Sequence, residues 1–145
     1  MRALIQRVSR ASVSVDQRIV GTIGNGLCVF VGVTHADDAT TAKKLADKIW
    51  NLRVFEDTQG LMNHAVGELT GDVLVISQFT LYGNTKKGRR PSFVQAARPE
   101  TAEPLIRGLC EALTDLGANV STGQFQKHME VEIHNDGPVT LTIDV

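Results

Sequence analysis

ALIQRVSRASVSV, residues 3–15, is the stretch that decides the fold, because its side chains alternate in character and β-branched residues recur along it. An alternation of period two predicts a long strand with one buried face. The next apolar run, GLCVFVGV at residues 26–33, is almost uninterrupted and indicates a central strand that is covered on both faces. Turn residues separate the two runs and frame a short strand at residues 18–22.

Two further segments carry apolar residues at helical spacing. The first follows Asp37 and Asp38, which supply N-cap and first-turn carboxylates, and runs to about Asn51. The second begins near Thr101 and closes at Gly117, a glycine in the C′ position. The predicted buried faces are Ala42, Leu45, Ala46 and Ile49 in the first helix and Leu105, Ile106, Leu109, Leu113 and Leu116 in the second.

The remaining predicted elements are short strands, which outnumber the helices. They lie at residues 52–55, 71–78, 120–122, 129–134 and 139–145. The sequence Asn135-Asp136-Gly137-Pro138 is predicted to join the last two as a hairpin turn. With no internal repeat or linker, the pattern predicts a single α+β domain over residues 1–145, in which two main helices pack against a curved, mostly antiparallel sheet system.

Composition excludes several classes of protein. The chain has 145 residues, of which 42% are apolar and 21% charged, as in an ordinary globular domain. No stretch approaches the ~20 apolar residues of a membrane span, and the N-terminus does not read as a secretory signal, so a cytoplasmic protein is predicted. A net charge of −1 argues against a protein that coats RNA.

Cysteine and histidine positions predict neither a disulfide nor a metal centre. Cys28 lies in the central apolar run and Cys110 on the apolar face of the second helix, so both are interpreted as small buried hydrophobic residues. His35 and His64 have no partner at ligand spacing, and His128 and His134 would lie ~20 Å apart along one strand. No phosphate-binding or dinucleotide glycine motif is present, and no cofactor is predicted.

The first candidate site is the exit of the strand at residues 71–78, formed by Ser77, Gln78, Phe79 and Thr80. An unusually long polar loop, residues 82–98, follows it, and such loops are usually functional. Ser77 and Thr80 are candidate nucleophiles, but a hydroxyl nucleophile needs an adjacent base and no histidine is near in sequence. The backbone amides of Phe79 and Thr80 can instead form an oxyanion hole. The simpler alternative is a strand end whose hydroxyls bond to the backbone.

Two other segments can be interpreted either as functional or as ordinary structural elements. In the predicted turn, the Gly137–Pro138 bond can be cis, which would orient two neighbouring carbonyls in one direction, although an ordinary turn is the simpler interpretation. The long loop carries four cations followed by Phe93, and these can meet phosphates or can form a solvated loop. These cations, the candidate phosphate contacts, are Lys86, Lys87, Arg89 and Arg90.

The two motifs together carry a family resemblance. SQFTL at residues 77–81 and NDGPVT at residues 135–140 resemble the paired signature motifs of the D-aminoacyl-tRNA deacylases, also called D-tyrosyl-tRNA deacylases. The resemblance runs from end to end and includes residues 3–8, 90–93 and 122–123. It implies a barrel-like α+β homodimer, without a cofactor, whose active site lies at the subunit interface and receives the 3′-terminal adenosine of aminoacyl-tRNA.

The resemblance also implies roles for individual residues. A cis Gly137–Pro138 pair would reach into the partner subunit's pocket, and Arg7 would hold that element. Its carbonyls would clash with the β-carbon of an L-residue, so that chiral proofreading works by rejection. Glycine has no β-carbon, so glycyl-tRNA, including glycine mischarged on tRNA-Ala, is expected to be a second substrate. The remaining substrate-binding residues implied by the family are Val139, Phe125 and Met129.

Two chemical mechanisms remain open. In one, Thr80 is the nucleophile. In the other, which we favour because no base stands beside Thr80, the ribose 2′-hydroxyl activates water, backbone amides bind the oxyanion, and Gln78 orients the substrate. The chain departs from the family at Gln126 and Lys127, where small residues are usual.

Three rival functions are kept beside the deacylase. A related deacylase removes L-alanine from mischarged tRNA and is thought to have a trans Gly-Pro bond, whereas the two motifs here favour the D-specific branch. An RNA-binding module that uses residues 86–90 would bind RNA with strong salt dependence and hydrolyse no ester. An esterase with a Ser77 or Thr80 nucleophile would accept small esters that lack RNA.

Overall fold

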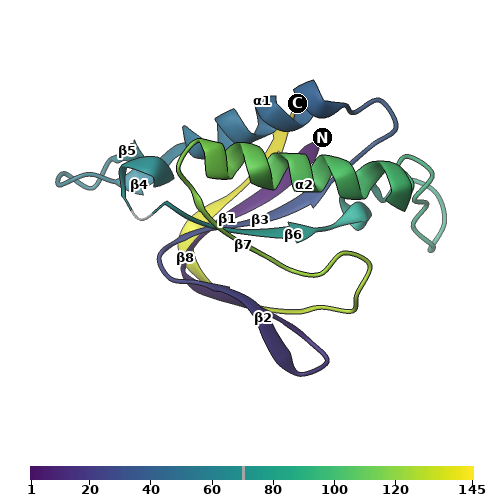
Figure 1. Cartoon of the computed structure of the whole chain (residues 1–145), viewed down its shortest axis with the longest axis horizontal. Coiled ribbons are helices and arrows are strands. Elements are labelled where there is room, and N and C mark those ends of the chain that lie inside the picture. Colours follow the sequence, from purple (N-terminus) through teal and green to yellow (C-terminus); the bar gives the residue numbers. More distant parts are fainter. Residues whose placement is uncertain (70) are drawn as a thin grey trace.

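The structure is a computed structural model that describes residues 1–69 and 71–145. In these residues a six-stranded main sheet forms the centre, and a two-stranded sheet lies at one end of the molecule (Figure 1). Along the main sheet the order is β2-β1-β3-β6-β7, and β8 also pairs with β1. Its strands are β1 (Arg2–Val15), β2 (Arg18–Ile23), β3 (Gly26–Gly32), β6 (Asp72–Ser77), β7 (Asn119–Thr122) and β8 (Glu130–Asp144), and the small sheet pairs β4 (Arg53–Glu56) with β5 (Met62–Ala65).

The strand directions in the main sheet are mixed. β1 is antiparallel to β2, β3 and β8, whereas β6 is parallel to both β3 and β7. The sheet curls until the two ends of its path meet, since the Ser121 hydroxyl of β7 donates to the Thr22 carbonyl of β2 at 2.9 Å. The prediction of a curved, barrel-like α+β fold is therefore confirmed.

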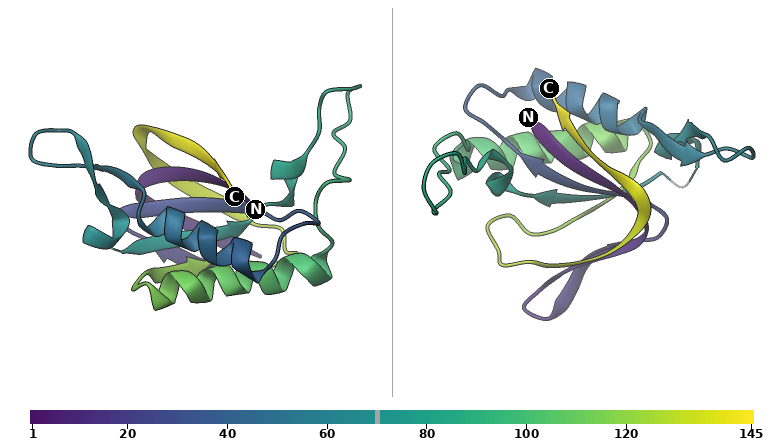
Figure 2. Two further views of the ribbon diagram at one scale, coloured as in Figure 1. Left: turned by 90° about the horizontal axis from the view of Figure 1, so that it is seen from above. Right: turned by 180° about the vertical axis from the view of Figure 1, so that it is seen from behind.

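Two helices cover one face of the curled sheet. α1 (Ala39–Trp50) and α2 (Pro99–Asp115) lie side by side across it (Figures 1 and 2). Asp38 caps α1, because its carboxylate accepts from the Thr41 amide at 2.8 Å, as the sequence predicts. α2 begins earlier than the predicted Thr101, since Pro99 fits the first helical position, where no amide donor is needed. Gly117 follows α2 with φ +106°, which confirms the predicted C′ glycine.

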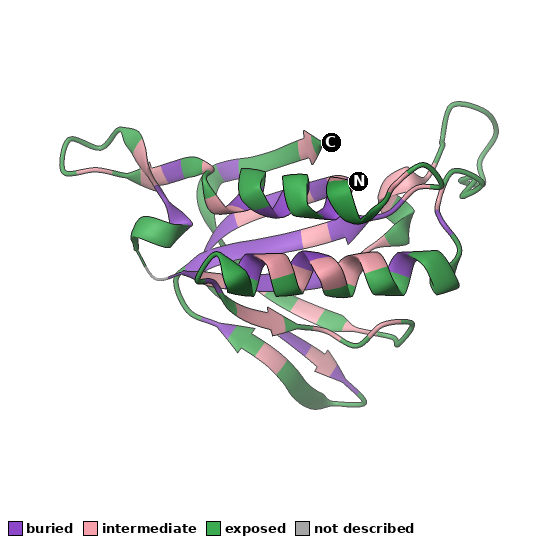
Figure 3. Cartoon of the chain, turned by 45° about the horizontal axis from the view of Figure 1, so that its top comes forward, coloured by how far each residue is buried: buried purple, intermediate pink, exposed green. Residues whose placement is uncertain are grey.

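The core is divided by the main sheet into two layers. The larger layer lies between the sheet and the helices, and the smaller one lies inside the curl, where it includes Val8, Val13, Cys28, Leu74 and Ile76. β3 separates the two, so almost every residue in it is buried, as its unbroken apolar sequence predicts. Figure 3 shows these buried strands beneath the two helices.

One predicted element is wrong: residues 135–138 do not form a hairpin turn. β8 runs without reversal from Glu130 to Asp144 and pairs along its length with β1, so its two halves do not pair with each other. Between the pairs Gln6–Thr140 and Val8–Asn135, residues 136–139 stand opposite Arg7 alone and form a large bulge. The long edge of β1 can accept both halves, which a local turn signal cannot reveal.

Smaller differences concern short elements and the cysteines. The sequence did not predict β5, nor the two 3₁₀ helices η1 (Val66–Glu68) and η2 (Phe79–Tyr82). Cys28 is buried as predicted, whereas Cys110 is only half-buried, and both are free thiols. Burial raises the pKa of the Cys28 thiol to about 12 and that of Cys110 to about 11. Over the described residues, no helix is long and apolar enough to cross a membrane.

Candidate active site

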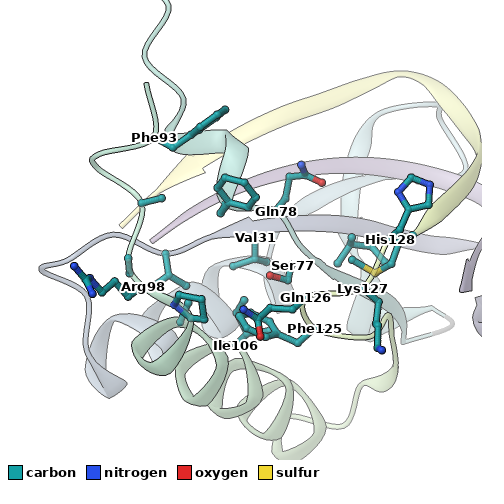
Figure 4. Close-up of a pocket in the computed structure, with 18 of the residues that line it drawn as sticks. Val31, Ser77, Gln78, Phe93, Arg98, Ile106, Phe125, Gln126, Lys127 and His128 are labelled. Carbon is teal, nitrogen blue, oxygen red and sulfur yellow. The ribbon is translucent and has the colours of Figure 1, made fainter. Parts of the chain in front are cut away.

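A cavity of about 590 Å³ opens between three segments of the chain (Figure 4). The end of β6 and the residues after it form one wall, the loop end and first turns of α2 form a second, and the segment after β7 forms the third. Apolar side chains form much of the lining, with a few polar groups among them, which is the usual character of a small-ligand site. The lining residues include Ser77, Gln78, Phe79, Phe93, Arg98, Ile106, Phe125, Gln126, Lys127, His128 and Met129.

The first wall contains the motif singled out in the sequence. β6 ends at Ser77, and the Gln78 amide donates to the Val31 carbonyl of β3 at 2.7 Å, which fixes the exit of the strand. The chain then turns into η2, so Phe79 faces the cavity and Thr80 lies just outside its lining. Among the described residues, the Thr80 hydroxyl has one hydrogen-bond partner, the Gln78 side-chain amide.

The backbone amides at this turn are available to a ligand. In a 3₁₀ helix the first amides have no carbonyl within the helix to bond to. Within residues 1–69 and 71–145, the amides of Phe79 and Thr80 donate to no other group of the chain. They are therefore free to donate to a substrate oxygen.

The third wall departs from regular backbone at Gln126. This residue has φ +58°, a left-handed conformation that side chains other than glycine rarely adopt. Phe125 and Met129, which the family resemblance predicts to bind the substrate, lie on either side of it in the sequence, and both line the cavity. Figure 4 shows the Gln126 side chain on the same side of the cavity as Ile106 of α2, with Ser77 above them. Gln126 and Lys127 thus belong to the cavity wall of this chain.

The NDGPVT motif lies apart from the cavity. The Gly137–Pro138 bond is cis, and both residues are exposed. Beside them the Arg7 guanidinium is buried, with 4% of the side chain exposed. Its Nη1 donates to the Val54 carbonyl at 2.6 Å, and its Nε donates to the Asp136 carbonyl at 3.3 Å and pairs with the Asp136 carboxylate at 2.9 Å. Arg7 therefore ties the bulge to the body of the sheet.

Two other contacts complete this element. The Asn135 side-chain amide donates to the Arg7 carbonyl at 2.9 Å and to the Val139 carbonyl at 3.1 Å, so it bridges the base of the bulge. The Val139 side chain is buried in the larger core layer, not exposed at a surface. The motif is thus a fixed projection whose outermost residues are Gly137 and Pro138.

The sequence-predicted site residues therefore fall into three groups. Ser77, Gln78, Phe79, Phe125 and Met129 line one cavity, with Thr80 beside it. Gly137, Pro138 and Val139 lie in the separate bulge, and Arg7 lies opposite it on β1. Lys86, Lys87, Arg89 and Arg90 lie on an exposed segment that projects from the body near the start of α2 (Figure 2).

The cavity residues that were not predicted as site residues include Arg98, Phe93 and His128. Arg98 occupies the N-cap position of α2 without a side-chain capping bond, Phe93 lies at the base of the projecting loop, and His128 follows the strained Gln126. The end of a long loop at a helix start is a signal that could have indicated Arg98. Within the described residues, no three His, Cys, Asp or Glu side chains gather as metal ligands.

Comparison with known proteins gives a consistent result. A family model described as D-Tyr-tRNA(Tyr) deacylase matches residues 4–144. A D-aminoacyl-tRNA deacylase of Symbiobacterium thermophilum is 56% identical over 144 residues, which span 99% of this chain and 95% of that protein. Another, from Mycolicibacterium smegmatis, is 52% identical over 148 residues and covers both chains completely.

Two solved structures share the fold. The c-Myc DNA Unwinding Element Binding Protein has a TM-score of 0.93 and 37% identity, over 100% of this chain and 99% of that one. A structure described as a probable eukaryotic D-amino acid tRNA deacylase has a TM-score of 0.84 over 99% and 98% of the two chains. Its identity is 16%, so that likeness concerns the fold alone.

Proposed function

The chain belongs to the D-Tyr-tRNA(Tyr) deacylase family, whose members hydrolyse aminoacyl-tRNA esters, and on that premise we propose how its residues perform the reaction. The cavity receives the 3′-terminal adenosine of tRNA together with its D-amino acid. The ester carbonyl lies against residues 77–80, where the amides of Phe79 and Thr80 are unbonded within the described chain. That pair of free donors beside a cavity is the observation that carries the proposal. A tRNA substrate implies a cytoplasmic location.

Substrate-assisted hydrolysis fits this wall better than a threonine nucleophile. The Thr80 hydroxyl contacts the Gln78 amide, and among the described residues no histidine or carboxylate reaches it. A hydroxyl without a base is a weak nucleophile. The ribose 2′-hydroxyl therefore activates a water molecule, which attacks the ester carbonyl. The Phe79 and Thr80 amides stabilise the negative charge on the carbonyl oxygen, and the 3′-oxygen leaves with a proton as the D-amino acid is released.

A second subunit supplies the chiral filter. Gly137 and Pro138 are exposed and contribute nothing to the described lining of the cavity in their own chain. In a homodimer with the active sites at the interface, the bulge of one subunit enters the cavity of the other. Its carbonyls stand where the β-carbon of an L-residue would lie, whereas a D-residue directs its side chain elsewhere. Arg7 holds the bulge against displacement by the wrong substrate.

The same filter predicts a second substrate. Glycine has no β-carbon, so a filter built on a backbone clash cannot reject it. Glycyl-tRNA, including glycine mischarged on tRNA-Ala, is therefore hydrolysed as well. The identity of a D-side chain matters little, because that side chain points away from the filter.

The test compares matched D- and L-tyrosyl-tRNA with purified protein and no added metal. We expect rapid loss of the D-ester, an intact L-ester, and a strong loss of rate when the terminal adenosine lacks its 2′-hydroxyl. Thr80→Ala should keep most of the activity, because the backbone donors survive the substitution. If Thr80→Ala abolishes hydrolysis while the 2′-deoxy substrate reacts normally, threonine is the nucleophile and the substrate-assisted mechanism is wrong.

A further inference from the structure

Two exposed aromatic rings stand at the mouth of the cavity. Phe79 and Phe93 form an edge-to-face pair with ring centroids 5.1 Å apart, yet 55% of Phe79 and 37% of Phe93 remain exposed. Phe93 lies close over Gly83, since a β-carbon on Gly83 would lie 3.0 Å from its ring. Figure 4 shows the Phe93 ring at the outer edge of the group of lining side chains. Exposed rings held in this way are suited to bind something flat and apolar.

The segment between these rings carries a concentration of unpaired positive charge. Residues 84–92 form a projecting arm, closed at its base by two backbone hydrogen bonds between Asn84 and Ser92 of 2.8 and 2.9 Å (Figure 2). Within the described part of the chain, its four cations form no ion pair. They are Lys86, Lys87, Arg89 and Arg90.

Arg98 adds a further cation at the rim of the cavity, and Figure 4 shows its side chain pointing away from the other labelled lining residues. It lines the cavity and likewise has no carboxylate partner among the described residues. Four of the chain's 15 Lys and Arg residues lie within the five positions 86–90. In a chain of net charge −1, positive charge is therefore concentrated on the arm.

The base of the arm is anchored firmly enough to orient it. The Thr34 hydroxyl donates to the Gln95 carbonyl at 2.6 Å, and the Ala97 amide donates to the Val33 carbonyl at 2.9 Å. The His35 ring also bonds to the Val94 carbonyl at 2.8 Å. Phe93 and Arg98 therefore keep a defined position relative to the cavity, while the tip of the arm stays exposed to solvent.

We propose that the single-stranded 3′ end of tRNA crosses this mouth, with the base of the penultimate nucleotide stacked on Phe93 and the RNA backbone bound by Arg98 and the cations of the arm. The inference rests on the proposed function, which places the terminal adenosine in the cavity. Stacking rings beside a track of cations are the usual means of holding single-stranded RNA. The interaction tolerates any base, since every base offers a flat face.

The decisive experiment compares a full-length D-tyrosyl-tRNA with D-tyrosyl-adenosine, which ends before the proposed contact. For Phe93→Ala we expect kcat/KM to fall roughly 5- to 100-fold further on the tRNA than on the adenosine ester, on which any loss measures the effect of the substitution on the cavity itself. Phe93→Trp, which keeps a flat ring, should restore the tRNA activity. Equal losses on both substrates would overturn the proposal, because they would mean that Phe93 only shapes the cavity, and so would an unchanged activity on tRNA.

The arm is tested through salt dependence. For Lys86→Ala/Lys87→Ala, the slope of log kcat/KM against log salt should become shallower by about 0.7 for each phosphate contact that is lost. The matched control is Lys43→Ala/Lys44→Ala, which removes two exposed lysines of α1 that do not line the cavity and should leave the slope unchanged. Identical slopes for the arm variant and the wild type would show that the arm does not bind RNA.

A binding measurement separates this inference from the proposed function. An uncharged RNA hairpin with a tRNA 3′ end and 2-aminopurine at the penultimate position should lose fluorescence on binding, and Phe93→Ala should abolish that loss. If the wild type hydrolyses neither ester but still quenches 2-aminopurine, the proposed function fails and the proposed binding of the RNA 3′ end at the mouth stands. If it hydrolyses both esters and no quenching occurs, the proposed RNA binding at the mouth is wrong and the proposed deacylase function stands.

Discussion

Replacement of Arg7 by alanine should both destabilise the fold and loosen the bulge at residues 136–139. The guanidinium is buried and bonds to two backbone carbonyls, of Val54 and Asp136, that come from distant parts of the chain. Alanine would leave the Val54 carbonyl without this donor in a buried setting. The bulge would keep the Asn135 contacts but, among the described residues, would lose the contacts that connect it through Arg7 to β4.

The magnitude follows from the individual contacts. The short buried bond to Val54, with a charged donor, contributes about 2 kcal/mol. The longer bond to Asp136 and the ion pairs to Asp136 and Glu56 add about 1 kcal/mol, because both carboxylates are more than half exposed and water screens them. A loss of about 3 kcal/mol should lower the Tm of a chain of this length by roughly 6–12 °C.

Urea unfolding and the ratio of D- to L-tyrosyl-tRNA hydrolysis measure the two effects. Arg7→Ala should lower the unfolding free energy by the stated amount and reduce the D/L ratio, since the chiral filter is no longer held in place. Arg10→Ala is the matched control, because Arg10 lies on the same strand, is 66% exposed, and should change stability by less than about 0.5 kcal/mol. If Arg7→Met matched the wild type in both stability and D/L ratio, the assigned role of the guanidinium would be wrong.

Two further predictions concern the packing of two glycines and the N-cap of α1. Gly26→Ala should destabilise the chain by about 1–3 kcal/mol, because the new β-carbon would lie 2.2 Å from a backbone oxygen of β6. Gly108→Ala meets nothing within 4 Å inside α2 and should stabilise by about 0.5–1 kcal/mol, so equal effects of the two variants in urea unfolding would refute the packing argument. Hydrogen bonds from Thr41 hold the pKa of Asp38 below its ordinary value of 3.8, so this carboxylate stabilises α1 above that pH and the contribution is lost as the pH falls through the lowered pKa. Asp38→Ala should therefore be less stable than the wild type at pH 7, and a stability difference that does not shrink as the pH falls below 3.8 would contradict this account.

The sequence correctly predicted those elements that a few neighbouring residues determine. The alternation in β1, the unbroken apolar run of β3 and the Asp38 cap each depend on a few neighbouring residues, and the structure has them where they were expected. The bulge at residues 136–139 was mistaken for a hairpin turn because its residues carry the same turn signal in either setting. What distinguishes the two is the long edge of β1, which is a property of the assembled sheet.

For the same reason, only part of the candidate site could be predicted from the sequence. Ser77, Gln78 and Phe79 could be identified at a strand end, and Phe125 and Met129 came from the family resemblance. Nothing local indicates that these two segments share a cavity with residues 93–98. Their meeting depends on which strands are neighbours and on the direction in which each strand runs.

Strand direction explains where the cavity lies. β3, β6 and β7 are mutually parallel neighbours, so their carboxyl ends meet at one edge of a sheet that is otherwise antiparallel. The chain leaving β3 anchors residues 94–97, the chain leaving β6 supplies residues 77–80, and the chain leaving β7 continues to residues 125–129. Crevices beyond the carboxyl ends of parallel strands are the general location of ligand sites in α/β sheets. The two parallel pairs, which a mostly antiparallel prediction does not locate, are therefore the part of this fold that builds its cavity.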